Sequence, residues 1–89
     1  MDENINLNHN IIMEDRKRII LTGVKDVNNF DEETISLETH HGTLVIKGEL
    51  LHILNFNTEK EDLSAEGKIH ALIYTAQEKS KNFISKLFR

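Results

Sequence analysis

Hydrophobic and polar residues alternate through the middle of the chain. In TISLET, residues 34–39, Ile35 and Leu37 alternate with polar side chains. A period of two is typical of a β-strand with one buried and one solvated face. TLVIKG, residues 43–48, follows a His-Gly pair in which Gly42 is free to adopt the positive φ that a tight turn needs. These two stretches predict a β-hairpin.

Further strands are predicted on both sides of this hairpin. RIILTGV, residues 18–24, is rich in β-branched residues and ends near a glycine. ELLHILNFN, residues 49–57, precedes a polar loop, and LSAEGKIHALIYT, residues 63–75, is either a strand pair or one long strand broken at Gly67. The predicted fold class is mainly β, a small antiparallel β-sheet or roll of about five or six strands.

The chain also contains a weak internal pseudo-repeat. GVKDVNNF, residues 23–30, and GELLHILNF, residues 48–56, each place a glycine before an apolar run that ends in Asn-Phe, and an acidic turn follows both. Two related β units of about 25 residues would explain this similarity, and so would chance resemblance among short strands.

The alternation selects a set of residues for the core. The residues predicted to be buried are Ile20, Leu21, Val24, Val27, Phe30, Ile35, Leu37, Leu44, Ile46, Leu51, Ile53, Phe56, Leu63, Ile69, Ala71 and Ile73.

The two ends differ from the β domain, which we expect to span 16–75. Residues 1–15 are rich in Asn and acidic side chains and are expected to form a flexible N-terminal arm. Residues 76–89 lack Gly and Pro and place Phe83, Ile84, Leu87 and Phe88 at helical spacing, which predicts a short C-terminal amphipathic helix. Packing on the protein's own sheet or a second subunit, binding to a partner or membrane surface, and disorder all remain open for it.

Composition narrows the class of protein. A chain of 89 residues forms one small domain, and such a domain buries only about 60 to 65% of its unfolded surface, so oligomerisation would help its stability. There is no cysteine, which excludes disulfides and thiolate sites and favours a reducing, intracellular compartment. The N-terminus lacks the basic start and apolar run of a signal peptide, and no apolar stretch approaches the roughly 20 residues that span a bilayer.

Metal binding is an alternative because the chain has five histidines. His40 and His41 are adjacent and would point apart in a strand or turn, whereas His52 and His70 could meet only if their strands pair. Four convergent ligands are usual in a structural zinc site. We therefore predict no metal and no cofactor, and keep a small ligand- or metal-binding β module that uses these four histidines as the alternative.

Catalysis and nucleic-acid binding find little support. The chain has no Gly-x-Ser-x-Gly elbow, no dinucleotide or phosphate loop, and paired carboxylates only in polar loops. Its net charge is −4 and its aromatic residues are sparse, which disfavours a nucleic-acid platform. The expected protein is not an enzyme but a soluble interaction module.

Several short motifs in a fixed order resemble a known family. They are LTGV at 21–24, VNNFD at 27–31, LET at 37–39, GTLVIKG at 42–48, EGKI at 66–69 and the terminal FISKLFR. In this order the chain resembles the YabP/YqfC family of sporulation proteins from endospore-forming bacteria, and is most similar to the YabP branch. The resemblance covers about residues 16–89.

The resemblance implies a non-enzymatic sporulation protein, an assembly or interaction module in endospore envelope formation, where coat and cortex are built. It implies a location in the cytoplasm, in the mother cell or at the forespore envelope surface. We expect self-association and binding to another sporulation or envelope protein, with peripheral membrane contact through the C-terminal segment as an option. The predicted partner-binding residues are Lys81, Phe83, Ile84, Lys86, Leu87, Phe88 and Arg89.

Overall fold

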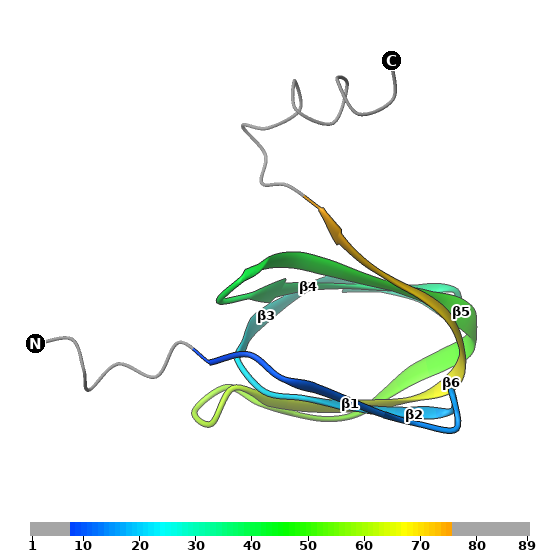
Figure 1. Cartoon of the computed structure of the whole chain (residues 1–89), viewed down its shortest axis with the longest axis horizontal. Helices are drawn as coiled ribbons and strands as arrows, with labels where there is room; N and C mark the ends of the chain where they lie inside the picture. Colours follow the sequence, from blue (N-terminus) through cyan, green and yellow to red (C-terminus); the bar gives the residue numbers. More distant parts are fainter. Residues whose placement is uncertain (1–7, 76–89) are drawn as a thin grey trace, which may run out of the picture.

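Six antiparallel strands form one sheet. The structure, a computed structural model, describes residues 8–75. The strands are β1 (Ile11–Glu14), β2 (Arg18–Leu21), β3 (Val24–Phe30), β4 (Thr34–Thr39), β5 (Gly42–Asn57) and β6 (Asp62–Thr75). They pair in the order β1-β2-β6-β5-β4-β3 (Figure 1). Between residues 8 and 75 no helix is long and apolar enough to cross a membrane.

The sheet rolls over on itself because β5 and β6 are long enough to take part in two layers. The first half of β5 pairs with β4, and the second half of β5 pairs with the first half of β6, which in turn pairs with β2. In Figure 1, β3, β4 and the start of β5 form one layer, and β1 and β2 lie in the other. Both long strands curve from one layer to the other at the same side of the molecule.

Backbone geometry concentrated at one place produces this curvature. The register between β5 and β6 shifts at Lys47/Gly48 and again between Glu49 and His52, as bulges that bend a strand do. Gly67 has φ +141°, and a Cβ there would lie 2.7 Å from the Leu50 carbonyl oxygen. The bend therefore needs a residue without a side chain, and β6 runs through this glycine as one long strand rather than a strand pair.

The core lies between the two layers. Its buried residues are Ile19, Leu21, Val24, Ile35, Leu37, Leu44, Ile46, Leu51, Leu63, Ala65 and Ile69. Most of them were predicted from the alternation. Val27, Ile53 and Phe56 are partly buried and pack against this cluster.

Three members of the predicted core are wrong, and two core residues were missed. Ile20, Phe30 and Ile73 are 36%, 63% and 43% exposed. In β2 the inward residues are Ile19 and Leu21, and because side chains alternate between faces, Ile20 between them must point outward. Two adjacent isoleucines give no sign of which one faces the core. Ala65, also missed, is buried because it faces inward in β6, and its small size hid it.

The predicted hairpin is present. β4 and β5 pair with Thr39 opposite Gly42, and residues 40 and 41 form the turn. The Thr39 hydroxyl donates to the Gly42 carbonyl over 2.7 Å and accepts from the His41 amide over 3.0 Å. These bonds satisfy the one buried polar side chain among the described residues. The stretch with adjacent histidines is thus a turn.

The two ends require corrections. Ile11–Glu14, assigned to a flexible arm, form β1, because pairing with β2 satisfies their backbone groups. The fold class was wrong in including a C-terminal amphipathic helix, since the structure is an all-β sheet with no helix in 8–75. A helix of about 12 to 15 residues is marginal in water without a surface to pack on, and strands alone complete this core. Residues 76–89, on which that prediction fell, lie outside the described ones.

Truncating a buried leucine should lower the stability of the protein more than truncating a leucine on the outer face of the sheet. We expect Leu37→Ala to lower the free energy of unfolding by about 2 to 5 kcal/mol, because it removes a fully buried side chain. The matched control is Leu54→Ala, at a position 46% exposed, for which a loss below about 1 kcal/mol is expected. Urea unfolding of the two variants measures both; equal losses would contradict this core.

A second pair of variants tests the bend. Gly42 and Gly67 both have positive φ, but a Cβ at Gly42 meets nothing closer than 3.8 Å. Gly42→Ala should therefore cost only the backbone strain of about 1 to 2 kcal/mol, and Gly67→Ala should cost clearly more because the new methyl group collides with main chain. Thermal and urea unfolding give the comparison. Similar losses would show that the bend does not depend on that close approach.

Candidate functional site

Two strand edges are left without a neighbour on the same side of the roll. β3 is the last strand of the sheet and pairs only with β4. After the bend, β5 leaves β4 and pairs only with β6, so residues 52–57 also form an edge. No strand pairing joins β3 to β5 within the described chain. The two edges face each other across the mouth of the roll.

Backbone hydrogen bonds hold this mouth at both ends. At one end, the Val24 amide donates to the Glu61 carbonyl over 2.9 Å. At the other end, the Leu51 amide donates to the Glu32 carbonyl over 2.8 Å. Near the first of these bonds, the imidazole of His40 lies 2.7 Å from a Glu61 carboxylate oxygen. The space between the two ends therefore has a fixed length.

The opposite side of the roll is bridged differently. His9 Nδ1 donates to the Thr22 carbonyl over 2.7 Å, so its Nε2 accepts the Tyr74 hydroxyl proton over 2.5 Å. Desolvation by burial raises the pKa of Tyr74 above its ordinary value of 10.0, which keeps this phenol a donor. The Ile69 amide also donates to the Arg16 carbonyl over 2.9 Å. Side chains and a turn thus close the side that the two free edges do not occupy.

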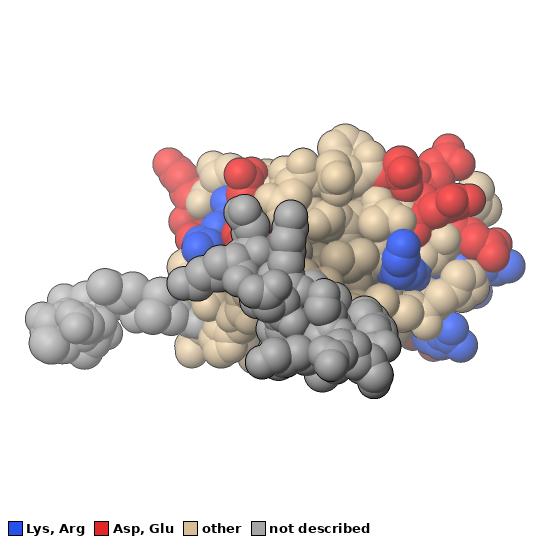
Figure 2. Space-filling view, turned by 90° about the horizontal axis from the view of Figure 1, so that it is seen from above, with Lys and Arg blue, Asp and Glu red and all other residues tan. Residues whose placement is uncertain are grey.

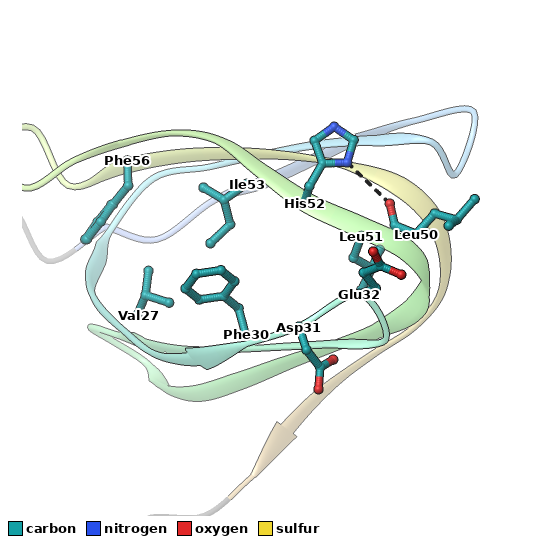
Figure 3. Close-up of a pocket in the computed structure, with 9 residues that line it drawn as sticks. All are labelled: Val27, Phe30, Asp31, Glu32, Leu50, Leu51, His52, Ile53 and Phe56. Atoms are coloured by element: carbon teal, nitrogen blue, oxygen red, sulfur yellow. Dashed lines mark hydrogen bonds between the residues drawn. The ribbon is translucent and has the colours of Figure 1, made fainter.

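A groove of about 760 Å³ lies between the two edges. We call it the edge groove, and its lining residues are Val27, Phe30, Asp31, Glu32, Leu50, Leu51, His52, Ile53 and Phe56. Figure 3 shows the side chains of Val27 and Phe30 on β3 and of Ile53 and Phe56 on β5 pointing into the same space. Phe30 remains 63% exposed there. The structure therefore presents aromatic and aliphatic surface between two strand edges.

Carboxylates lie at the end of the groove next to the bend. Asp31 and Glu32 both line it. Asp31 Oδ1 accepts the amides of Glu33 and Thr34, each over 2.8 Å, so this carboxylate also shapes the turn between β3 and β4. The backbone of Glu32 is fixed by the hydrogen bond that its carbonyl accepts from the Leu51 amide. The edge groove is apolar along its length and acidic at one end.

Leu50 stands at the same end in a strained conformation. Its φ is +56°, a region that costs a non-glycine residue roughly 1 to 2 kcal/mol. Its side chain is 66% exposed, so packing recovers little of that strain. Strained residues that persist without a packing reason are concentrated at functional sites, which makes Leu50 a candidate contact residue.

The histidines of the alternative prediction do not converge. His40 pairs with Glu61, while His70 Nε2 lies 3.2 Å from a Glu49 carboxylate oxygen. His52 lies 3.5 Å from Glu66 on the outer surface. In 8–75 no three His, Cys, Asp or Glu side chains gather as metal ligands would. His40, His52 and His70 therefore each pair with a different carboxylate, and the ring centroid of His41 lies 5.7 Å from that of His9.

The pair at Glu66 is mainly with Arg18 rather than with His52. Arg18 donates to a Glu66 carboxylate oxygen over 2.9 Å. The hydrogen bond and charge of Arg18 hold the pKa of Glu66 below its ordinary value of 4.5, with a smaller contribution from His52. Since the arginine remains charged throughout, this link between β2 and β6 does not require a protonated histidine.

The predicted partner-binding residues lie outside the described chain. They are Lys81, Phe83, Ile84, Lys86, Leu87, Phe88 and Arg89. The sequence analysis missed the edge groove, although it contained one signal. The two copies of the pseudo-repeat are β3 and the second half of β5, and their matching residues, Val27 with Ile53 and Phe30 with Phe56, line the groove from opposite sides.

Comparison with known proteins gives the family of the chain. A model of the YabP family matches residues 5–81. The chain belongs to the YabP family. It is 38% identical over 84 residues to the spore protein YabP of Bacillus subtilis (strain 168), an alignment that covers 91% of this chain and 84% of that protein. The resemblance drawn from the motifs is confirmed, and the match begins earlier and ends earlier than those motifs.

Membership of the YabP family is consistent with a role in sporulation. The Bacillus subtilis relative is named as a spore protein and not as an enzyme.

Substitution of Leu50 should show that its side chain does not contribute to the stability of the fold. Leu50→Asn introduces a residue that adopts positive φ at lower cost than leucine, and it removes the exposed apolar side chain. We expect the free energy of unfolding to stay unchanged or rise by up to about 1 kcal/mol. The control, Leu51→Asn at a position only 3% exposed, should lower it by more than about 2 kcal/mol. Urea unfolding decides, and a comparable loss for both variants would place Leu50 in the core.

Proposed function

We propose that this protein is a non-enzymatic assembly module of the endospore envelope, which binds other polypeptides during formation of the coat and cortex. It works in the mother cell cytoplasm or at the forespore envelope surface. Its partners are further copies of itself and another envelope protein. The observation that carries the proposal is the edge groove, an apolar surface between two unpaired strand edges in a member of the YabP family.

The walls of the groove support a polypeptide as its occupant. Unpaired edges carry backbone N–H and C=O groups that another chain can pair with, and native proteins usually protect such edges. Here Phe30 and Leu50 are exposed instead, at 63% and 66%. Large apolar side chains at this level of exposure favour a binding site.

The size of the groove alone would also suit a small molecule, because ligand sites typically have about 300 to 1,000 Å³. Such sites bury most of a ligand and place a few polar groups around it. The edge groove offers carboxylates at one end only and an open apolar length between two strands. This shape favours an extended apolar segment of a protein over a small ligand.

The C-terminal segment is the second part of the proposal. Phe83, Ile84, Leu87 and Phe88 supply apolar contacts, and Lys81, Lys86 and Arg89 direct the segment toward an acidic partner. The described strands end at Thr75, so a chain ending there retains every strand and the whole described core. Removal of the segment should therefore affect association rather than folding.

Light scattering after size-exclusion chromatography tests this role. The full chain is expected to form an oligomer, and a chain ending at Thr75 is expected to be a monomer with an unchanged far-ultraviolet circular dichroism signal per strand residue and a similar melting temperature. Equal masses for two folded proteins would refute association through the C-terminal segment. A truncated chain with lost β signal would instead show that the segment is part of the fold.

A further inference from the structure

We infer that the edge groove receives the C-terminal apolar and basic segment, residues 81–89, of a second copy of this chain. This inference rests on the proposed assembly function and names the occupant of its binding surface. The groove is described by the structure, and the segment is taken from the sequence. Shape, charge and the direction of the last strand connect them.

The apolar content of the two surfaces matches. The groove presents two aromatic and two aliphatic side chains between its strand edges, Val27, Phe30, Ile53 and Phe56. Residues 81–89 contain two phenylalanines, an isoleucine and a leucine within six positions. Burying such side chains stabilises a complex by about 1.5 to 3 kcal/mol for each one that becomes fully buried. A segment of this kind supplies the apolar cover that the groove lacks among the described residues.

The charges of the two parts are opposite. Residues 76–89 carry four basic side chains and one acidic one, a net charge of +3, so the rest of the chain carries −7 because the whole carries −4. Asp31 and Glu32 contribute two of these negative charges at one end of the groove, where the Asp31 carboxylate points outward (Figure 3). Seen from above, Asp and Glu also gather toward both ends of the molecule (Figure 2). Lys86 and Arg89 can therefore pair with the acidic end while the phenylalanines enter the apolar length.

The direction of β6 favours a groove on another copy. The sheet order separates β6 from β3 by β5 and β4. At roughly 4.8 Å for each strand spacing, the segment would have to cross about 14 Å of sheet before turning into its own groove. Figure 3 shows the end of β6 running away from the ring of strands that holds the groove residues. A chain that leaves in this direction reaches a neighbouring molecule without reversing.

This contact joins two different surfaces, a segment and a groove, and each copy carries one of each. Reciprocal exchange of segments between two copies gives a closed, two-fold symmetric pair, whereas a head-to-tail contact that does not close gives a chain of subunits. Both outcomes suit an assembly protein, and both make association dependent on ionic strength because the pairing charges are exposed.

Charge exchange in the full-length protein tests the inference. The groove variant carries Asp31→Asn, which retains the Oδ1 acceptor for the turn, together with Glu32→Lys, and changes the acidic end from −2 to +1. The segment variant carries Lys86→Glu and Arg89→Glu. Each should raise the dissociation constant of self-association at least tenfold in light scattering and analytical ultracentrifugation. An equimolar mixture should recover association, because each variant's segment then meets a groove of opposite charge.

A matched control changes the same charge elsewhere. Glu14→Gln with Glu59→Lys also removes two negative charges and adds one positive charge at exposed positions outside the groove. It should associate like the unchanged chain. Melting temperatures of all variants confirm folding, and Leu50→Asn should weaken association without loss of stability.

The outcomes separate this inference from the function on which it rests. If association needs residues 76–89 but the groove variant associates normally, the occupant is wrong and the assembly function remains. Loss in both variants without recovery in the mixture would show that the segment and the groove do not pair between copies, and would overturn the inference. If the full and shortened chains are both monomers, both the inference and the proposed assembly role of the segment are wrong.

Discussion

The rest of the structure depends on the shared bend of β5 and β6. A flat sheet of six strands would expose one apolar face, because residues 8–75 contain no other layer to cover it. Bending both long strands at one place brings two halves of the same sheet face to face, so that Ile19 and Leu21 pack against the layer of Leu37 and Leu44. Gly67 permits the close approach that the bend requires. The core is therefore a consequence of curvature in two strands.

The same bend creates the edge groove. Before it, β5 lies between β4 and β6; after it, β5 has lost β4 and follows only β6. The free edge of β5 then comes to face the free edge of β3. Closing the gap with another strand pair would need residues that this topology uses elsewhere. The groove is thus linked to the fold, because the bend that frees the β5 edge is the one that covers the core.

The sequence predicted the features of the fold that depend on residues adjacent in the chain. The hairpin at His41 and Gly42 follows from local turn chemistry, and the strands follow from alternation. The register of β2 could not be predicted, since Ile19 and Ile20 are equally apolar and only pairing with β6 decides which one faces inward. β1 was hidden for a similar reason, because Ile11 gains its place through a partner strand ten residues away.

The groove could not be predicted from local sequence patterns, since which strand edges stay unpaired depends on the topology of the whole sheet. Its two walls were nevertheless visible as a pseudo-repeat whose meaning was unknown. In the structure, those copies meet as the two edges, with Val27 and Phe30 lining the groove from β3 and Ile53 and Phe56 from β5 (Figure 3). The repeat therefore makes the groove apolar from both sides.

Exposed strand edges normally favour uncontrolled pairing between molecules, and the two edges here are limited in different ways. β3 has register shifts at Val24/Asp26 and Val27/Asn29, and such bulges disrupt the regular ladder that another strand would need. The β5 edge is short and is held at the bend by Leu51. Unlimited sheet extension is disfavoured, whereas side-chain contacts inside the groove remain available. Binding at this site should therefore depend on the apolar and charged side chains of the occupant, which gives an open edge the selectivity that the proposed assembly function requires.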